Sequence, residues 1–416
     1  MLAKLKKLAT TETGKDTFIV FWGTILNVII GGIFFIIAPR LLGPTNYGLF
    51  ATVYTTSVLT VRLTSLGIDT GILRFTNSLS KDSNAFLVIA LKWYLFLGIA
   101  AGVVGYIISP KLAHILAQPS ITNLLRIAFA STILFHLTNL FTAGLQAKRE
   151  FKKAAIMLIA NNTSRLLLLI AGSYFFIINL YLLTLTFFLS AIASVIIGGF
   201  FMPFEITKIN RDLEKKFFKF NIWIWLSLTL SAIPFDNYLL LKIAGPLQTG
   251  LYAAPFKFLN YAYQIGGNFT AVLASRFSSF ENDSKAKIYS LKAAIFPLLF
   301  SVIFLFFILF SDLVILLLFG KQYLGAAEIL RILSVGSIFF FMATIPSSVI
   351  LYYFGKSSIS FVITVLKYLL FVILLIVLIP SKQAIGAAYS FTVSEGFAFV
   401  LMAAYVLIRF QKKDAN

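Results

Sequence analysis

The chain has 416 residues, of which 59% are hydrophobic and only 12% are charged, and its mean hydropathy is +0.93. This composition excludes a soluble globular or disordered protein. The formal net charge of +20 would indicate nucleic-acid binding in a soluble protein, but most Lys and Arg residues lie in short segments between apolar runs, where membrane orientation explains them. We therefore expect no nucleic-acid partner. With no cysteine and two histidines, the chain has no disulfide or Cys-based zinc site, and we expect no metal, no cofactor and no catalytic residue.

Apolar segments of membrane-spanning length follow one another along the whole chain. A bilayer-spanning helix needs about 20 predominantly apolar residues. The predicted helices are 17–38, 47–73, 86–108, 121–145, 154–178, 180–203, 222–243, 250–275, 291–310, 328–354, 358–379 and 384–408. No hydrophilic stretch has the length of a soluble domain. The sequence therefore predicts an all-α polytopic membrane protein with about 12 transmembrane helices, whose function lies between its helices.

The distribution of basic residues predicts the orientation of these helices. With the N-terminus inside, the inner segments contain 22 Lys and Arg residues and the outer loops contain 5. Short loops rich in Lys and Arg stay in the cytoplasm. We therefore expect a multi-pass protein of the cytoplasmic (inner) membrane with both termini cytoplasmic.

The chain contains an internal repeat. Residues 40–51 recur as residues 242–253, displaced by 202 positions, and Arg74-Phe75 recurs as Arg276-Phe277 at the same displacement. We expect an N-terminal six-helix bundle over residues 1–210 and a C-terminal one over residues 211–416. An even number of spans per half keeps the halves parallel, which is typical of transporters with a site at the interface between repeats.

The repeated segment predicts structural turns at the outer membrane face. Pro ends a helix, and Gly adopts backbone angles that other residues avoid. We assign this structural role, and no catalytic one, to Gly43, Pro44, Gly48, Gly245, Pro246 and Gly250.

Three segments carry a resemblance to a known family. They are Arg40 through Phe50 with Ser65-Leu66-Gly67-Ile68-Asp69, then Asp236 through Tyr252, and Leu318 through Tyr323 before Leu330-Arg331. The chain resembles the polysaccharide repeat-unit flippases, the Wzx-type branch of the superfamily that also contains the multidrug and toxin extruders and the lipid II flippases. Twelve spans rather than fourteen favour the repeat-unit flippases over the lipid II flippases.

The resemblance implies a MATE-like fold and a transporter rather than an enzyme. It implies a polyprenyl-pyrophosphate-linked oligosaccharide as substrate, contact with membrane lipids and other polysaccharide-assembly membrane proteins as partners, in O-antigen or exopolysaccharide biosynthesis. The family often has a basic residue after the Asp of helix seven, whereas this chain has Asn237 after Asp236.

Eight cations lie inside predicted spans, and four of them lie two or more turns from a loop. A cation at the bilayer centre costs about 2.5–3.5 kcal/mol on insertion, so it does not face lipid there. The four central cations are the candidate substrate-binding residues, Arg62, Arg165, Lys257 and Lys367. Two membrane acids, Asp236 and Glu395, leave an excess of positive charge, which predicts a cavity for an anion such as pyrophosphate.

Further polar side chains accompany these cations. Tyr261, Gln264 and Asn268 follow Lys257 at helical spacing and form a polar stripe. Interhelical hydrogen bonding is an equally good explanation for the uncharged members. Asp236 follows Pro234, which is expected to open the helix, and either this acid or Glu395 is a candidate for coupling to a proton or sodium gradient. A fixed ion pair with Lys257 or another cation is the alternative for Asp236.

Other functions stay open at this point. A multidrug or lipid II exporter of the same fold is the nearest alternative, although a cationic cavity argues against cationic drugs. A membrane glycosyltransferase or polymerase needs a sizeable outer loop or a surface acid, and the longest outer segment is about Ser109 to Ser120. An acyltransferase needs a catalytic base, and His136 is the only intramembrane histidine, for which we favour a packing role.

Overall fold

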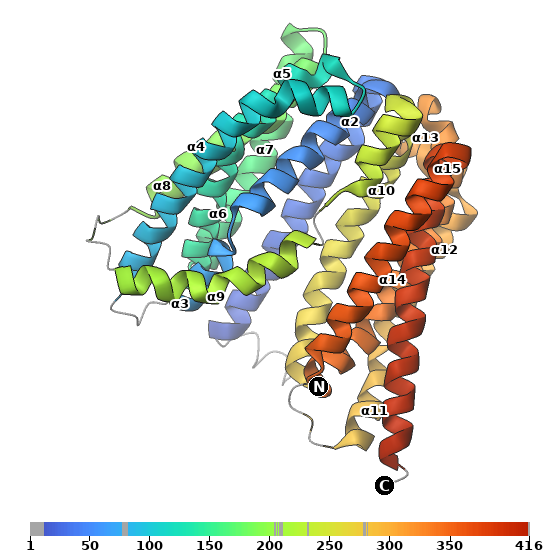
Figure 1. The fold of residues 1–416 in the computed structure, drawn as a ribbon. Helices are drawn as coiled ribbons and strands as arrows, with labels where there is room; N and C mark the ends of the chain where they lie inside the picture. Colours follow the sequence, from blue (N-terminus) through green and yellow to red (C-terminus); the bar gives the residue numbers. More distant parts are fainter. Residues whose placement is uncertain are drawn as a thin grey trace. The chain divides into compact units, whose positions relative to one another are not determined.

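The computed structural model describes residues 12–76, 82–203, 205, 207, 211–230, 233–277, 280 and 282–414. These residues form helices and no strand (Figure 1). Eight helical segments among them are long and apolar enough to cross a membrane, and the predicted all-α membrane fold is confirmed. Two of these segments, Trp22–Thr64 and Ser357–Gln411, are each long enough for two spans.

The described residues divide into two compact units. Unit 1 comprises residues 1–34 and 49–234, and unit 2 comprises residues 35–48 and 235–416. These limits differ from the repeat boundary expected between residues 210 and 211. The chain leaves unit 1 only after a further helix, Arg211–Leu230, which packs on the N-terminal helices.

Unit 1 contains most of the first long helix, α2 (Glu12–Thr64), followed by seven α-helices and one 3₁₀ turn. Those elements are α3 (Ile68–Phe75), α4 (Ser83–Ile115), η1 (Pro119–Ile121), α5 (Thr122–Ala130), α6 (Thr132–Ala147), α7 (Phe151–Phe175), α8 (Leu180–Phe201) and α9 (Arg211–Leu230). Its core is a buried apolar cluster contributed mainly by α3, α4 and α6, including Tyr94, to which α7 adds Met157 and α9 adds Phe217.

The second predicted helix, 47–73, ends earlier than expected. Helix α2 stops at Thr64, and a short break precedes α3. Leu66 and Gly67 in this break have φ angles of 47° and 69°, in the left-handed region that ends a helix. Arg62 and Asp69 therefore lie on two different helices, α2 and α3.

Unit 2 contains the remaining helices and the segment 35–48 of α2. Its elements are α10 (Phe235–Phe277), α11 (Asp283–Ala293), α12 (Ile295–Leu309), α13 (Ser311–Phe319), η2 (Lys321–Ala326), α14 (Ala327–Ser348), η3 (Val349–Tyr353) and α15 (Ser357–Asp414). Helix α15 holds two predicted spans, which meet at the non-helical residue Gln383. The unit's apolar core joins α10, α14 and α15 around Phe277 and Ile350.

The predicted seventh helix, 222–243, is wrong as a single element. Residues 211–230 form α9, which packs on α3 and α4, whereas α10 begins at Phe235. Ile233 and Pro234 between them are not helical. The reason is local, because Pro234 lacks a backbone donor and its ring clashes with a preceding turn of helix.

The repeat is visible in the backbone at two glycines. Gly43 in α2 has φ 70° and ψ 166°, and Gly245 in α10 has φ 83° and ψ 175°. Each is followed by a proline that starts the next helical piece, so each long helix contains a sharp kink.

The two helical pieces that follow these kinks cross within unit 2 at Gly48 and Gly250. A Cβ on Gly48 would lie 2.0 Å from the carbonyl oxygen of Pro246, and a Cβ on Gly250 would lie 1.8 Å from that of Pro44. The contact is reciprocal, as a two-fold relation between repeats requires. Gly48 and Gly250 thus lie one turn beyond the kinks, where they let two backbones approach.

Candidate functional site

Arg165 is the most deeply buried of the four candidate cations, with 7% of the residue exposed. It lies on α7 of unit 1, where its Nη2 donates to Asn161 Oδ1 at 3.0 Å and its Nε donates to Ser190 Oγ at 3.4 Å. The guanidinium carbon lies 4.0 Å from the ring centre of Phe187 and 5.3 Å from that of Phe34. Aromatic faces and neutral oxygens thus hold a guanidinium inside the bundle.

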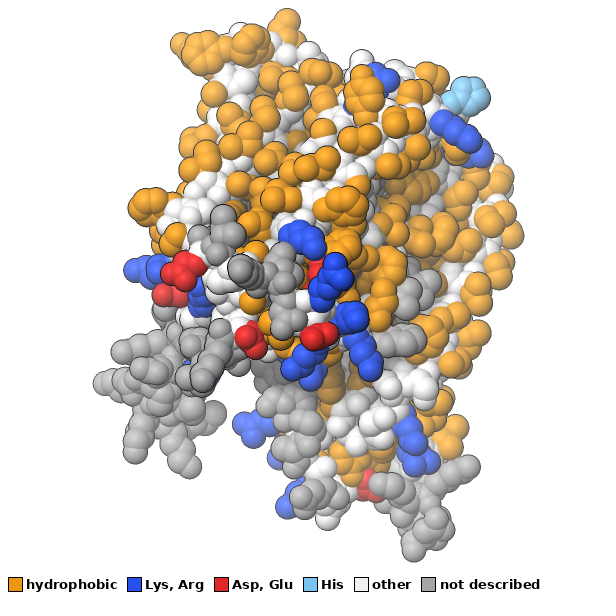
Figure 2. Space-filling model, turned by 60° about the vertical axis from the view of Figure 1, so that its left-hand side comes forward, with side chains coloured by type: hydrophobic (Ala, Val, Ile, Leu, Met, Phe, Trp, Pro, Cys, Tyr) orange, Lys and Arg blue, Asp and Glu red, His pale blue; other side chains and the backbone are white. Residues whose placement is uncertain are grey.

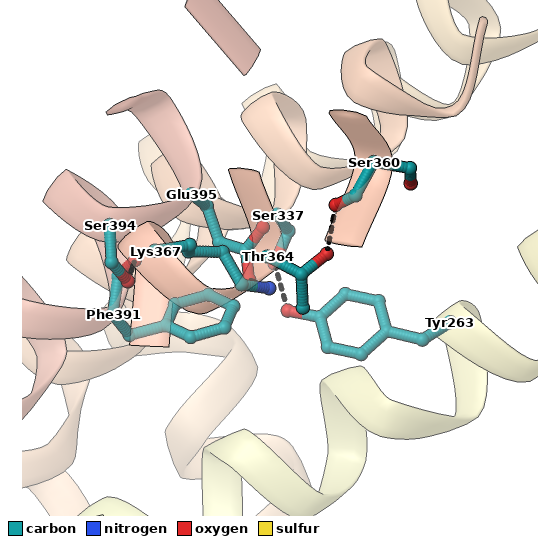
Figure 3. Close-up of polar contacts among 8 residues, drawn as sticks. All are labelled: Tyr263, Ser337, Ser360, Thr364, Lys367, Phe391, Ser394 and Glu395. Carbon is teal, nitrogen blue, oxygen red and sulfur yellow. Dashed lines mark hydrogen bonds and ion pairs between the residues drawn. The ribbon is translucent and has the colours of Figure 1, made fainter. Parts of the chain in front are cut away.

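Lys367 lies on α15 of unit 2 and follows Arg165 by 202 positions, the displacement of the repeated segment. Its Nζ donates to Glu395 Oε1 at 2.9 Å, and the two side chains are 19% and 9% exposed. Figure 3 shows the side chains of Lys367, Glu395 and Tyr263 converging from α15 and α10. A candidate substrate-binding cation and a candidate coupling acid therefore form one ion pair, which the residue types alone did not predict.

The polar cluster around this pair includes Tyr263 and Ser337. Ser337 Oγ donates its hydrogen to Leu333 O at 2.8 Å, so Tyr263 is the donor in the 2.8 Å hydrogen bond between the two hydroxyls (Figure 3). The Tyr263 ring packs against Phe340 and, nearly parallel, against Phe391. Tyr263 also interacts electrostatically with Glu395.

Asp236 lies at the start of α10 and is 6% exposed. Its Oδ2 accepts a hydrogen bond from the Tyr252 hydroxyl at 2.9 Å, and its Oδ1 accepts one from the Asn237 backbone N–H at 2.9 Å. Tyr368, next to Lys367, interacts electrostatically with both Asp236 and Glu395. Both candidate coupling acids thus belong to one polar region of unit 2.

Asp236 and Tyr252 occupy the positions that Phe34 and Phe50 occupy in the first repeat. Phe34 and Phe50 pack ring to ring with centroids 6.3 Å apart. The second repeat therefore has a carboxyl group where the first has an apolar ring. This difference makes the two halves chemically unequal at equivalent places in the fold.

Lys257 on α10 is partly buried, and its Nζ lies 5.1 Å from the ring centre of Phe35. The Tyr261 ring packs against the same phenylalanine at 6.0 Å. Gln264 is exposed. The side chain of Asn268 lies outside the described residues.

Arg62, the fourth candidate cation, is exposed on the last turn of α2. Its carbonyl oxygen accepts hydrogen bonds from Trp225 Nε1 at 3.1 Å and from Ser65 Oγ at 3.1 Å. Its side chain interacts electrostatically with Asp69. Arg62 and Arg165 belong to unit 1, whereas Lys257 and Lys367 belong to unit 2.

Several site neighbours were not predicted. Ser190, Tyr263 and Ser337 carry no signal in the sequence beyond being polar residues inside apolar spans. A buried serine bonds equally well to its own helix, as Ser337 does, so residue type alone does not identify an interhelical partner. Among the described residues, no group of three or more His, Cys, Asp or Glu side chains could hold a metal ion.

Basic residues also gather on the surface. Figure 2 shows Lys and Arg side chains in a belt below a broad hydrophobic surface on the face in view. Arg211, Lys215, Lys216 and Lys219 of α9 are exposed. Glu214 on the same helix is bound by Trp93 Nε1 and by Lys92 Nζ, the latter at 3.1 Å.

The pKa of the Glu214 carboxyl lies below its ordinary value. The hydrogen bond from Trp93 is the main cause, and the nearby ammonium of Lys92 acts in the same direction, against partial burial. Glu214 thus stays ionised and ties the first turn of α9 to α4.

Comparison with solved structures identifies the fold. The chain is similar to the inward-facing conformation of a multidrug resistance MATE family transporter of the MOP superfamily, with a TM-score of 0.75, 14% identity, and coverage of 94% of this chain and 96% of that one. It is similar to the lipid II flippase MurJ in an inward closed conformation, with a TM-score of 0.71, 14% identity, and coverage of 94% and 87%. A MOP superfamily transporter from Pyrococcus furiosus gives a TM-score of 0.61 at 15% identity, with coverage of 95% and 94%.

Sequence comparison identifies the family. No curated protein matches the chain. The model of the family described as "Polysaccharide biosynthesis protein" matches residues 36–328, which is more than half of the chain. The resemblance inferred from the three segments is therefore confirmed at the level of the polysaccharide biosynthesis family, and the expected MATE-like fold is confirmed. The chain belongs to this polysaccharide biosynthesis protein family, and its fold is similar to that of the solved MATE transporter and of the lipid II flippase MurJ.

Proposed function

We propose that the protein moves a polyprenyl-pyrophosphate-linked oligosaccharide repeat unit from the cytoplasmic to the outer leaflet by alternating access. The family and the transporter fold support a role in polysaccharide transport. The observation that carries the choice of an anionic substrate is Arg165, a guanidinium buried within the helices of unit 1.

A buried guanidinium suits pyrophosphate for a geometric reason. Its planar fork binds two oxygens at once, whereas an ammonium acts as a point charge. Arg165 is oriented by Asn161 and Ser190 and lies against Phe187, so its position is fixed before a substrate arrives. Preorganisation of this kind lowers the free-energy cost of binding.

The remaining candidate cations have different roles in this proposal. Lys257 and Arg62 assist the attraction of the anionic headgroup. Lys367 is paired with Glu395, so its charge becomes available only if that pair opens or if Glu395 is protonated. The pair thus supports a role in switching more strongly than one in permanent substrate contact.

The test is a flipping assay in proteoliposomes with defined lipid-linked sugar donors. Arg165→Lys keeps the charge but removes the fork, and we expect a loss of at least about tenfold in rate, which corresponds to about 1.4 kcal/mol. Arg126→Lys is the matched control, because Arg126 stacks on Tyr106 and donates to Asn123 away from this site. Equal rates for wild type and Arg165→Lys would contradict the proposed grip on pyrophosphate.

The same vesicles separate the alternatives. Export of a cationic drug without movement of any lipid-linked sugar would identify a multidrug exporter. Movement of lipid II but of no oligosaccharide repeat unit would identify a lipid II exporter. A membrane glycosyltransferase or polymerase would instead lengthen the sugar chain, which mass spectrometry of the recovered donor detects.

We further propose that transport is coupled to a proton or sodium gradient through Asp236. This carboxyl is buried, accepts hydrogen bonds from Tyr252 and Asn237, and begins a helix immediately after Pro234. A carboxylate beside a helix break can bind a cation or a proton. Asp236→Asn is expected to keep donor binding and to lose the acceleration caused by an imposed gradient, and unchanged gradient dependence would leave Glu395 as the candidate.

Membrane orientation is tested independently. We propose that both termini are cytoplasmic in the inner membrane, from the excess of Lys and Arg in inner segments. Because the chain has no cysteine, Lys111→Cys is expected to react with an impermeant reagent from outside and Lys152→Cys only from inside. Outside labelling of Lys152→Cys would refute this orientation.

A further inference from the structure

A second buried polar cluster lies in unit 1 and takes no part in the proposed substrate site. It joins Thr64 at the end of α2, Asp69 on α3, Tyr94 on α4 and His136 on α6. The Tyr94 hydroxyl donates to Asp69 Oδ1, and the rings of Tyr94 and His136 stack with centroids 4.5 Å apart and planes 10° apart. Both rings belong to residues that are 0% exposed.

The hydrogen bonds determine which nitrogen of His136 carries its hydrogen. Thr64 Oγ1 donates its single hydrogen to Thr60 O at 2.7 Å. The 2.8 Å contact between Thr64 Oγ1 and His136 Nε2 therefore requires the nitrogen to donate. His136 is then the Nε2–H tautomer, and Nδ1 presents a lone pair.

This lone pair has no partner among the described residues. His136 Nδ1 is buried and makes no hydrogen bond there. Tyr94, whose ring stacks on His136, belongs to the apolar core cluster that also contains Ile68, Ile72 and Leu140. A buried polar atom without a partner is unfavourable, and a native structure that retains one calls for an explanation.

The charges near His136 come from a small set of residues. Asp69 lies on the far side of the Tyr94 hydroxyl, and Arg62 interacts electrostatically with both Asp69 and Tyr94. Among the other charged side chains on neighbouring helices, Lys111 and Lys152 are exposed. The rest have their own contacts: Arg74 over Phe220, Lys92 with Glu214, Arg126 with Asn123, Lys153 with Glu150, and Arg165 with Asn161.

The cluster adjoins the break between α2 and α3. Thr64 is the last residue of α2, and Leu66 and Gly67 beside it have positive φ angles. Leu66 is unusual in this respect, because a branched side chain rarely adopts such a conformation. On the other side, Trp225 of α9 donates to the carbonyl oxygens of Arg62 and Leu63, which an α-helix leaves unbonded at its end. The break thus combines a residue in an unfavourable backbone conformation with a helix end that one tryptophan side chain holds in place.

We propose that Nδ1 of His136 is a proton-binding site whose occupancy is linked to opening of the break between α2 and α3. In the closed arrangement the site excludes water, and an additional charge there would be poorly compensated. Opening the break admits a proton to Nδ1. The resulting imidazolium is hydrated in the open arrangement and desolvated in the closed one, so protonation favours the open arrangement, because a ligand shifts an equilibrium toward the state that binds it better.

Cysteine accessibility tests this linkage without any substrate. Ser65→Cys places a thiol in the break, where Ser65 is 5% exposed, and Lys111→Cys provides an exposed thiol that corrects for the reactivity of the reagent. We expect the corrected labelling rate to rise about fivefold or more from about pH 8 to about pH 5.5, a range that spans the ordinary histidine pKa. His136→Phe is expected to remove this rise, and His114→Phe, which changes the only other histidine, is expected to retain it. The same rise in His136→Phe would overturn the proposal.

Imidazole NMR provides a second measurement if His136→Phe does not fold. In protein with ¹⁵N-labelled histidine, His114→Phe leaves a single imidazole signal. We expect the Nε2–H tautomer at neutral pH and loss of that preference in Thr64→Val, which removes the acceptor. Observation of the Nδ1–H tautomer in the parent protein would overturn the proposal, because Nδ1 would then have no free lone pair.

A contribution of the His136 proton site to transport rests on the proposed flippase function, and it is measured separately through the flipping rate in a pH gradient. We expect an imposed pH gradient to accelerate flipping by the wild-type protein. In His136→Phe, we expect the flipping rate with the gradient to lie within about twofold of the rate without it. Typical coupling between two sites amounts to about fivefold or more, so this residual effect would be well below it. If wild type moves no lipid-linked sugar, the proposed function fails while the labelling result still decides the proton site. If His136→Phe keeps full acceleration, the link between this site and transport is refuted.

Discussion

Replacing Gly48 with alanine should separate the two kinked helices at their crossing. The new Cβ would lie 2.0 Å from the carbonyl oxygen of Pro246 and 2.7 Å from the backbone nitrogen of Gly250. Both atoms belong to backbone inside a helix, so neither can turn aside as the end of a long side chain can. A carbon and an oxygen that are not bonded need about 3.2 Å or more, and the crossing must therefore widen by about 1.2 Å.

The magnitude follows from the contacts that such a shift weakens. A gap of about 1 Å removes up to half of the dispersion energy of each facing contact, and overpacking of a close interface typically costs about 1–3 kcal/mol, sometimes more. We expect about 3 kcal/mol for Gly48→Ala and a similar value for Gly250→Ala, whose Cβ would lie 1.8 Å from Pro44 O. Because both changes disturb the same contact, the double variant should cost less than the sum of the two.

The assay is thermal unfolding of the purified protein together with its flipping rate. Gly102→Ala is the matched control within a membrane helix, because the nearest atom to its Cβ would lie at 3.7 Å, an ordinary contact. Gly245→Ala isolates the backbone effect, since Gly245 has φ 83° and no atom within 4 Å of the new Cβ. If Gly48→Ala unfolds at the same temperature as Gly102→Ala, the close crossing of the repeats is refuted.

Three further outcomes follow from the ion pairs and the buried acid. Lys367→Met or Glu395→Leu alone should destabilise the protein by about 3–5 kcal/mol, because each single change leaves a buried charge without its counter-ion. The double variant should be destabilised much less. If chemical denaturation shows that the losses of the two single variants simply add in the double variant, the pairing is contradicted. The pKa of Glu214 is lower in the folded than in the unfolded protein, so the ionised carboxylate stabilises the folded state. This contribution is complete above the ordinary Glu pKa of about 4.3 and is lost as the pH falls through the lower, folded-state pKa. The melting temperature of wild type should thus decline more steeply in that acid range than that of Trp93→Phe, and parallel pH profiles would argue against this hydrogen bond. Asp236→Asn should leave the melting temperature within a few degrees of wild type, because the amide oxygen can accept from the Asn237 N–H while the amide NH2 donates to the Tyr252 hydroxyl oxygen, so a large loss would indicate a structural role in place of ion coupling.

The sequence by itself determined the class of the protein and much of its backbone. Mean hydropathy and the length of the apolar runs predict a polytopic helical protein because the hydrocarbon core leaves few other structures possible. The two kinks follow from Gly43-Pro44 and Gly245-Pro246, and the opening before Asp236 follows from Pro234, since glycine and proline act on the backbone locally.

Local sequence was less informative where a helix ends for a tertiary reason. The break after Thr64 divides a segment whose apolar content predicts a single span. There a side chain from elsewhere completes the helix end, because Trp225 of α9 donates hydrogen bonds to the last carbonyls of α2.

Only the tertiary structure decided which polar side chains are partners. Lys367 binds Glu395 across 28 positions of the chain, Arg165 binds Ser190 across 25, and His136 binds Thr64 across 72. Helical periodicity gives the face on which a residue lies, but it gives neither the rotation of one helix against another nor the relative depth of their side chains. Those two quantities are set by the packing of apolar surfaces over the whole helix, and they decide whether a buried charge meets a counter-ion, a hydroxyl or an aromatic ring.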